Sequence, residues 1–272
     1  MHHLTVPGPP AIALDCQGQG EILLFLHGIG GNRTNWHEQL AFFASRYQAV
    51  AIDVRGWGAS DDYDGPLDFD DVVDDIARVL AHLGAARCHL VGLSMGGLIA
   101  QHVLWRRPQM VSSAVFADTS AGPGEEHDAQ WIDEFLRLRK APLLAGKSPA
   151  DIAAHVARSL AAPNAPASSF ERLRDSIAAL HKDSYLKALD TVALYTRKLD
   201  HAAVRVPVHV MVGEHDQLTP LERARDLAQR FGGCTVDVVP NAGHLSNMDN
   251  ADGFNQLLDA FLRRVPTPEA HA

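Results

Sequence analysis

The sequence predicts an α/β protein with a mostly parallel central sheet flanked by helices, into which a helical cap is inserted. Short apolar runs alternate with amphipathic segments before residue 118 and again after residue 204, which is typical of parallel strands joined by crossover helices. Between these two parts only helical patterns occur. The chain has 272 residues, of which 46% are hydrophobic, and this is enough to bury a large core.

The expected strands are continuous apolar runs, because a strand covered on both faces has no side that must be polar. They lie at residues 11–14, 22–26, 49–52, 88–91, 114–117, 208–212 and 236–239. Helices are expected where apolar residues recur every three to four positions. These segments lie at residues 69–83, 98–105, 220–231 and 254–262.

The cap is expected where the alternation stops. Four short helical patterns, at residues 131–136, 152–160, 170–180 and 186–192, are punctuated by prolines. The predicted organisation is a core made of residues 1–121 and 204–272, with the cap at residues 122–203.

A Gly-x-Ser-x-Gly turn at residues 92–96 joins the strand at 88–91 to the following helix. At such a turn the backbone is strained, and the serine hydroxyl projects clear of the sheet. Gly92 and Gly96 fit there because a Cβ at either position would crowd neighbouring backbone. Ser94 is therefore the candidate nucleophile, and it needs a base within hydrogen-bond reach because an unassisted hydroxyl is a poor nucleophile.

The candidate base is His244. It lies in a glycine-flanked loop after the last expected strand, at the carboxyl edge where open α/β sheets build their sites. The residues alone leave two candidates for the acid that orients this base, since Asp216 follows the strand at 208–212 and Asp118 follows the strand at 114–117. The role requires a carboxylate on the far imidazole nitrogen, where it fixes the tautomer and stabilises the imidazolium.

These motifs, in this order, resemble those of the α/β-hydrolase superfamily. The resemblance includes HGIG at residues 27–30, the elbow, an aspartate after a late strand and GH at 243–244. Within the superfamily, GLSMGG at 92–97 and GHLSN at 243–247 are most similar to the 3-oxoadipate enol-lactonase and carboxylesterase group. The superfamily mostly places its acid after the later of these two strands, and GEHD at 213–216 resembles its usual sequence there, so the resemblance favours Asp216 as the acid. The loop at 27–30 departs from the Asn-Ser-x-Gly version of several enol-lactonases, which leaves the substrate open.

Backbone groups are expected to form the oxyanion hole. One donor is the N–H of Met95, directly after the nucleophile, and the other is the N–H of Ile29 in the glycine loop. His27 is expected to brace that loop. Asp53 and Arg55 are expected to form a salt-bridged corner away from the elbow.

The resemblance implies a serine hydrolase that cleaves a small ester or lactone, with an enol-lactone bearing a carboxylate as the specific case. A carbon–carbon bond hydrolase or a perhydrolase using the same triad is the alternative. A ligand receptor that keeps the fold without turnover is a third hypothesis, and the complete triad weighs against it. Cationic cap residues suit a carboxylate. The candidate substrate-binding residues are Trp131, Arg137, Arg139, Lys140, Tyr195 and Arg197.

Charge and motif content argue against other classes of function. The formal net charge of −9 disfavours nucleic acid and anionic membranes as partners. No apolar run approaches the roughly 20 residues that span a bilayer. The absence of a signal-peptide pattern and three widely spaced cysteines lead us to expect a cytoplasmic protein with free thiols. No zinc or nucleotide motif occurs, so no metal or cofactor is expected. The sequence does not determine the oligomeric state.

Overall fold

The computed structural model describes residues 1–122, 129–195 and 199–266, and its centre is a sheet of eight strands. The strands are β1 (His2–Val6), β2 (Ile12–Gln17), β3 (Ile22–Leu26), β4 (Gln48–Ile52), β5 (Cys88–Leu93), β6 (Val111–Ala117), β7 (Val208–Gly213) and β8 (Val236–Val239). Their order is β1-β2-β4-β3-β5-β6-β7-β8. β2 pairs antiparallel with β1 and β4, and all other neighbours are parallel. The prediction of a mostly parallel sheet is confirmed.

Strand β1 was not predicted from the sequence. It lies at the edge of the sheet, and all of its residues except Val6 are exposed. An exposed edge strand carries no continuous apolar run, so the pattern that identified the buried strands is missing there.

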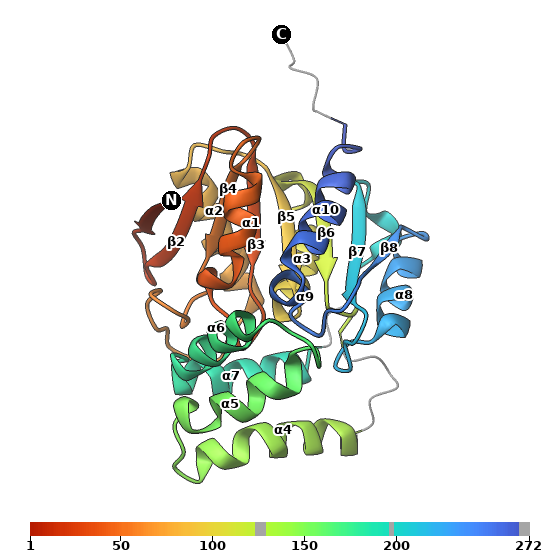
Figure 1. Cartoon of the computed structure of the whole chain (residues 1–272). Coiled ribbons are helices and arrows are strands. Elements are labelled where there is room, and N and C mark those ends of the chain that lie inside the picture. The colour runs from red at the N-terminus through yellow and green to blue at the C-terminus, as the bar shows by residue number, and fades with distance from the viewer. Residues whose placement is uncertain (123–128, 196–198, 267–272) are drawn as a thin grey trace.

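Helices cover both faces of the sheet. α1 (His37–Phe43) and α10 (Ala251–Leu262) pack together on one face, whereas α2 (Phe69–His82) and α3 (Met95–Arg106) pack together on the other (Figure 1). α8 (Leu221–Arg230) packs on β7 and β8. Because both faces are covered, every residue of β3 and of β5 is buried.

Between β6 and β7, the described residues contain four α-helices, which form the expected helical insertion. They are α4 (Ala129–Leu144), α5 (Pro149–Leu160), α6 (Ala167–Ala178) and α7 (Lys182–Ala193), and they gather at one end of the sheet (Figure 1). α5 packs on α6, and α4 packs on α7. Ser148 begins α5 with a capping box. The exact bounds of the cap, 122–203, stay a prediction.

The parallel arrangement decides where a site can form. β3, β5, β6, β7 and β8 run in one direction, so the loops that follow them meet at a single edge of the sheet. Residues of the cap helices and of these loops line one cavity. The structure therefore brings the candidate residues that follow different strands to one place, between the sheet edge and the cap helices.

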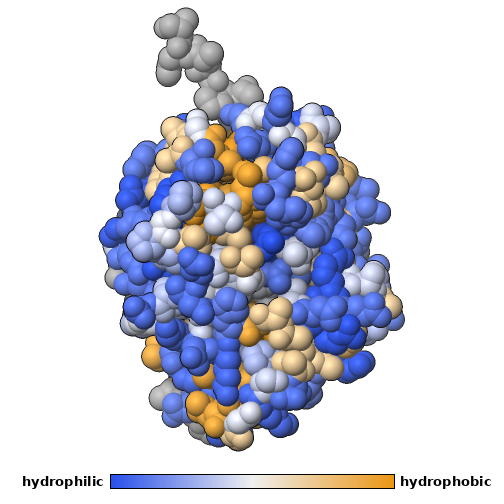
Figure 2. Space-filling model, turned by 90° about the vertical axis from the view of Figure 1, so that its left-hand side faces the viewer, coloured by the Kyte–Doolittle hydropathy of each residue, from blue (hydrophilic) through white to orange (hydrophobic). Residues whose placement is uncertain are grey.

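The outer surface is mostly hydrophilic on the face drawn in Figure 2. Hydrophobic residues gather in its upper centre and again near its lower end, at the level of α4–α7 in Figure 1. In the described part of the chain, no helix is both long enough and apolar enough to cross a membrane. Three cysteines are free: Cys16 and Cys88 are buried, and Cys234 is half-buried.

Candidate active site

Ser94 lies at the sharp turn between β5 and α3. Its backbone has φ 54° and ψ −117°, a conformation that costs a non-glycine residue about 1–3 kcal/mol. The surrounding contacts impose this turn: the Ser94 N–H donates to Ala117 O at 2.9 Å, and Thr119 Oγ1 donates to Ser94 O at 2.8 Å. A Cβ on Gly92 would lie 2.2 Å from Gly96 O. Only glycine therefore permits this close approach of the two backbone segments.

A hydrogen-bonded chain runs from Ser94 to Asp216 through one imidazole. Ser94 Oγ lies 2.9 Å from His244 Nε2, and His244 Nδ1 lies 2.9 Å from Asp216 Oδ2. With the proton on Nδ1, the ring donates to the carboxylate and Nε2 accepts the serine proton. The N–H groups of Leu218 and Thr219 donate to Asp216 Oδ1 at 2.8 and 3.0 Å, and Thr219 Oγ1 donates to Oδ2 at 2.7 Å. The carboxylate is thus held by donors on both oxygens.

The electrostatics of the Ser94, His244 and Asp216 side chains suit proton transfer. Burial alone would raise the pKa of Asp216, but His244 and the donors of Thr219 outweigh it and lower the pKa to about 2. Burial alone would lower the pKa of His244, but the charge and hydrogen bond of Asp216 outweigh it and raise the pKa. Asp216 is therefore ionised at neutral pH, and the imidazole is a stronger base than a free histidine.

Asp118, the other acid left open by the sequence, does not contact the imidazole. Its Oδ1 accepts from Gly213 N at 2.8 Å, and its Oδ2 accepts from the N–H and the hydroxyl of Ser246 at 3.0 and 2.6 Å. Its backbone φ is +47°. Burial and the Asp216 carboxylate raise the pKa of Asp118 to about 7. Asp118 thus ties the end of β7 to the loop after His244.

The glycine loop presents a peptide N–H to the same cavity. Gly28 O accepts from His27 Nδ1 at 2.8 Å and from Gly31 N at 3.0 Å. In a trans peptide the next N–H points the opposite way, and this is the N–H of Ile29. Ile29 and Met95 both line the cavity, and within the described residues neither N–H donates to a protein atom. The two groups are available to stabilise an oxyanion.

His27 braces this loop as the sequence suggested. Its Nε2 accepts from Val54 N at 3.1 Å, which leaves Nδ1 protonated to donate to Gly28 O. Burial lowers the pKa of His27, so the ring stays neutral and keeps this tautomer. The loop is held from one side by His27 and from the other by Trp57 Nε1, which donates to Ile29 O at 3.0 Å.

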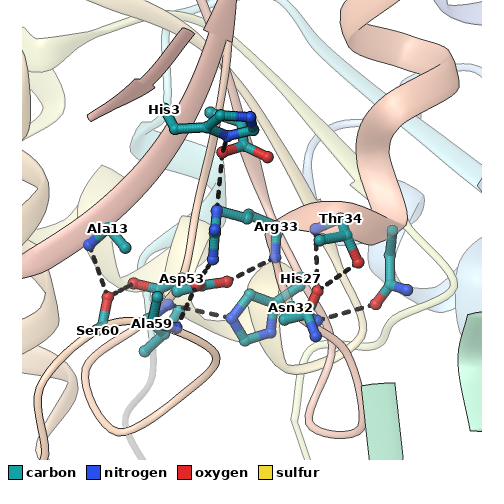
Figure 3. A network of polar contacts seen from close by, with 12 residues as sticks. His3, Ala13, His27, Asn32, Arg33, Thr34, Asp53, Ala59 and Ser60 are labelled. Atoms are coloured by element: carbon teal, nitrogen blue, oxygen red, sulfur yellow. Dashed lines mark hydrogen bonds and ion pairs between the residues drawn. The ribbon is translucent and has the colours of Figure 1, made fainter. Parts of the chain in front are cut away.

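Asp53 and Arg55 do not pair with each other, so the predicted corner needs correction. Asp53 accepts from the backbone N–H of Arg33 at 2.7 Å and forms an ion pair with the Arg33 guanidinium. The same guanidinium donates through Nε to Asp15 at 2.8 Å (Figure 3). Arg55 instead donates to Asp75 on α2 at 2.7 Å. Both residues are structural, but each joins a different pair of segments, because their side chains leave the loop in different directions.

A cavity of about 380 Å³ lies above Ser94. Ser94 and His244 form part of its lining, and most of its walls are apolar. Residues of the cap and of α3 supply these walls: Leu98, Phe135, Val156, Leu160, Leu173 and Tyr185. The space suits a small organic substrate with few polar groups.

Only some of the expected cationic residues reach this cavity. Arg139 lines it. Arg137 pairs with Glu134 one turn away on the exposed side of α4, and Lys140 pairs with Asp190 of α7 at 2.7 Å. Neither lines the cavity. The difference follows from helix geometry, because residues 137, 139 and 140 project in different directions from α4.

The other expected substrate-binding residues do not add to the lining. The Tyr195 ring packs 5.4 Å from that of Phe69, outside the cavity. Trp131 lies in α4, but its side chain is outside the described residues, and so is the whole of Arg197. Arg223, at the start of α8, lines the cavity and was not singled out from the sequence. Among the described residues, no cluster of three or more His, Cys, Asp or Glu side chains could hold a metal ion.

Thr219 is a further residue that the sequence analysis missed. It lies three residues after Asp216 and two residues before α8, and it donates to that carboxylate from both its backbone and its hydroxyl. An aspartate followed three residues later by threonine, just before a helix, is a local signal that could have indicated this turn.

Known proteins resemble this chain over nearly its whole length. The family described as alpha/beta hydrolase fold matches residues 21–251. The 3-oxoadipate enol-lactonase 2 of Acinetobacter baylyi is 27% identical over 251 residues, which are 91% of each chain. The putative carbamate hydrolase RutD of Variovorax paradoxus is 28% identical over 280 residues, covering 98% of this chain and 97% of that one. The malate-bound structure of a thermophilic esterase from Thermogutta terrifontis superposes with a TM-score of 0.87 at 26% identity, covering 98% and 100% of the two chains.

Proposed function

The chain belongs to the alpha/beta hydrolase family, and from this premise we propose that it is a serine hydrolase that cleaves small carboxylic esters or lactones through an acyl-enzyme on Ser94. The observation that carries the proposal is a pair of hydrogen bonds, each 2.9 Å long, that link Ser94 to His244 and His244 to Asp216. It lies beside a cavity of about 380 Å³. In this proposal residues 122–203 act as the cap that closes the cavity.

Each bond change in the reaction has a group beside it. His244 Nε2 takes the proton of Ser94 as Oγ attacks the ester carbonyl carbon. The carbonyl oxygen becomes an oxyanion, which the N–H groups of Ile29 and Met95 stabilise. His244 then gives its proton to the leaving oxygen as the C–O bond breaks. Water enters under the same base, and the acid is released with Ser94 restored. In a lactone the leaving oxygen stays tethered, so protonation by His244 also prevents reclosure of the ring.

The substrate class we propose carries a carboxylate. Arg139 is the expected cation that lines the cavity, and its guanidinium stacks 4.5 Å from the centre of the Phe135 ring. This stacking leaves the N–H edge of the guanidinium accessible for a bidentate contact. The protein's net charge of −9 gives an anion no long-range attraction, so a local cation must provide recognition. The similarity to an enol-lactonase and to a malate-bound esterase supports this class.

The nucleophile is tested with p-nitrophenyl acetate and a reactive phosphonate. The wild type should release a burst of phenolate and become labelled on Ser94, and Ser94→Ala should lose both. Ser120→Ala is the matched control, because Ser120 lines the same cavity without contacting His244. Wild-type turnover in Ser94→Ala would refute the assignment. A wild type without turnover on any ester would favour the non-catalytic receptor.

The carboxylate is tested by comparing a carboxylated lactone with its neutral methyl ester. The wild type should prefer the charged lactone, and Arg139→Met should lose about tenfold or more of kcat/KM on it, since hydrogen bonds to charged groups contribute about 1.5–3 kcal/mol. Arg137→Met is the control on the same helix, because Arg137 pairs with Glu134 outside the cavity. Equal rates on both substrates in all three proteins would instead indicate a general carboxylesterase.

A further inference from the structure

The loop that carries His244 is hydrogen-bonded directly to the cap. The His244 N–H donates to Leu160 O at 2.9 Å, at the end of α5. Asp249 Oδ2 accepts two N–H groups at once, from Ala162 of the connector after α5 at 2.8 Å and from Gly243 at 2.9 Å. The connector between α5 and α6 and the loop at 243–244 are thus joined at three backbone N–H groups.

Close packing accompanies these hydrogen bonds. A Cβ on Gly243 would lie 2.6 Å from Ala162 N and 2.7 Å from Leu160 O. Only glycine allows the connector to lie this close to the loop. Asp249 is 7% exposed, so water competes little with its carboxylate for the two N–H donors. The arrangement therefore holds one relative position of the connector and the loop.

The residue directly before this connector belongs to the cavity wall. Leu160, the last residue of α5, lines the cavity and accepts the His244 N–H with its backbone oxygen. We propose that Asp249 is a positioning residue that fixes the α5–α6 connector to the His244 loop, so that the acyl-pocket wall at Leu160 and the imidazole keep one spacing. This inference rests on the proposed function, in which His244 is the base.

A displaced base or wall has a recognisable kinetic signature. Moving a catalytic group by about 1 Å can cost about a hundredfold in rate, and a wall that recedes admits longer acyl chains. Loss of the Asp249 carboxylate should therefore lower kcat and shift the preference from acetate toward longer acyl esters. A residue that only stabilises the fold would lower resistance to denaturant without changing either quantity in the folded protein.

The main test compares Asp249→Leu and Asp249→Asn with Ser169→Ala. Leucine removes the acceptor, whereas asparagine keeps a carbonyl oxygen. Ser169→Ala is the matched control, because Ser169 Oγ joins α6 to Met248 O at 2.5 Å without touching residues 243–244. The kcat and KM for p-nitrophenyl acetate and hexanoate are measured at a temperature where circular dichroism shows each protein folded.

We expect kcat on the acetate ester to fall about ten- to hundredfold in Asp249→Leu, with the hexanoate-to-acetate ratio of kcat/KM raised severalfold. Asp249→Asn should recover part of both, and Ser169→Ala should match the wild type. A folded Asp249→Leu protein with kcat and acyl preference within twofold of wild type would overturn the inference.

Two further measurements cover the remaining outcomes. If Asp249→Leu does not fold, Gly243→Ala replaces it, since its Cβ pushes the connector away and should give the same shift in acyl preference. If the wild type shows no Ser94-dependent turnover, the proposed function fails, and the low-field NMR signal of the His244 Nδ1 proton then reports its position. An unchanged signal in the Asp249 and Gly243 variants would overturn the inference separately.

Discussion

Replacing Asp216 with Asn perturbs the proposed reaction at one well-defined contact. Asp216 Oδ2 lies 2.9 Å from His244 Nδ1. The wild-type carboxylate stabilises the imidazolium that forms when Ser94 is deprotonated, and it keeps the proton on Nδ1. Asparagine removes the charge, and its amide can turn either an oxygen or an NH₂ group toward the ring.

The size of the effect follows from this distance. Two unit charges centred about 4 Å apart attract by about 4 kcal/mol at an effective dielectric constant of about 20. Loss of that attraction raises the barrier by an amount equivalent to about a thousandfold in rate. A wrong tautomer adds to the loss, and the corresponding change in a serine protease triad lowers kcat about 10⁴-fold. We therefore expect kcat to fall by about 10³ to 10⁴ in Asp216→Asn.

Asp118→Asn is the matched comparison, because Asp118 is also a buried carboxylate at the end of a neighbouring strand. Its oxygens reach Gly213 and Ser246 instead of the imidazole, so we expect less than a tenfold loss. The assay is steady-state and burst-phase hydrolysis of p-nitrophenyl acetate, with folding checked by circular dichroism. If Asp118→Asn lost the thousandfold and Asp216→Asn stayed within tenfold of wild type, the assignment of the acid would be refuted.

Three further predictions concern protonation and packing. First, kcat/KM should fall on acidification through a pKa above the usual value of about 6.5 for histidine, because the pKa of His244 is raised. Asp118→Asn removes a charge that raises the pKa of His244, so the variant should lose kcat/KM at a lower pH than the wild type. Second, burial lowers the pKa of His209, against the opposing charge of Asp237. The unfolded chain therefore binds more protons below about pH 6.5, so the free energy of unfolding should drop from pH 7 to pH 5, with a shallower slope in His209→Gln. Third, Gly96→Ala would place a Cβ 2.3 Å from a carbonyl oxygen of β3, and urea denaturation should show a loss of about 3 kcal/mol or more.

The sequence by itself determined the elements and the local geometry of the nucleophile. Buried strands such as β3 and β5 are continuous apolar runs, and this signal depends only on neighbouring residues. The sequence signal of the elbow at Ser94 is also local, because Gly92 lets the backbone before the serine approach the backbone of Gly96 after it. The edge strand β1 escaped prediction because its residues are exposed and have no such run.

Tertiary structure alone decided which side chains reach one another. Asp118 and Asp216 follow adjacent parallel strands, and the resemblance favoured Asp216 without showing the contact. In the folded chain Asp216 reaches the imidazole of His244, whereas Asp118 accepts from Gly213 N. In the cap, Arg137 and Arg139 are two residues apart, yet only Arg139 lines the cavity.

The contact between Asp249 and the connector at Ala162 joins residues 87 positions apart. Contacts of this kind depend on how separate elements pack, because a hydrogen bond needs its donor and acceptor within about 3 Å. Spacing along the sequence carries no information about that distance once the chain has turned back on itself.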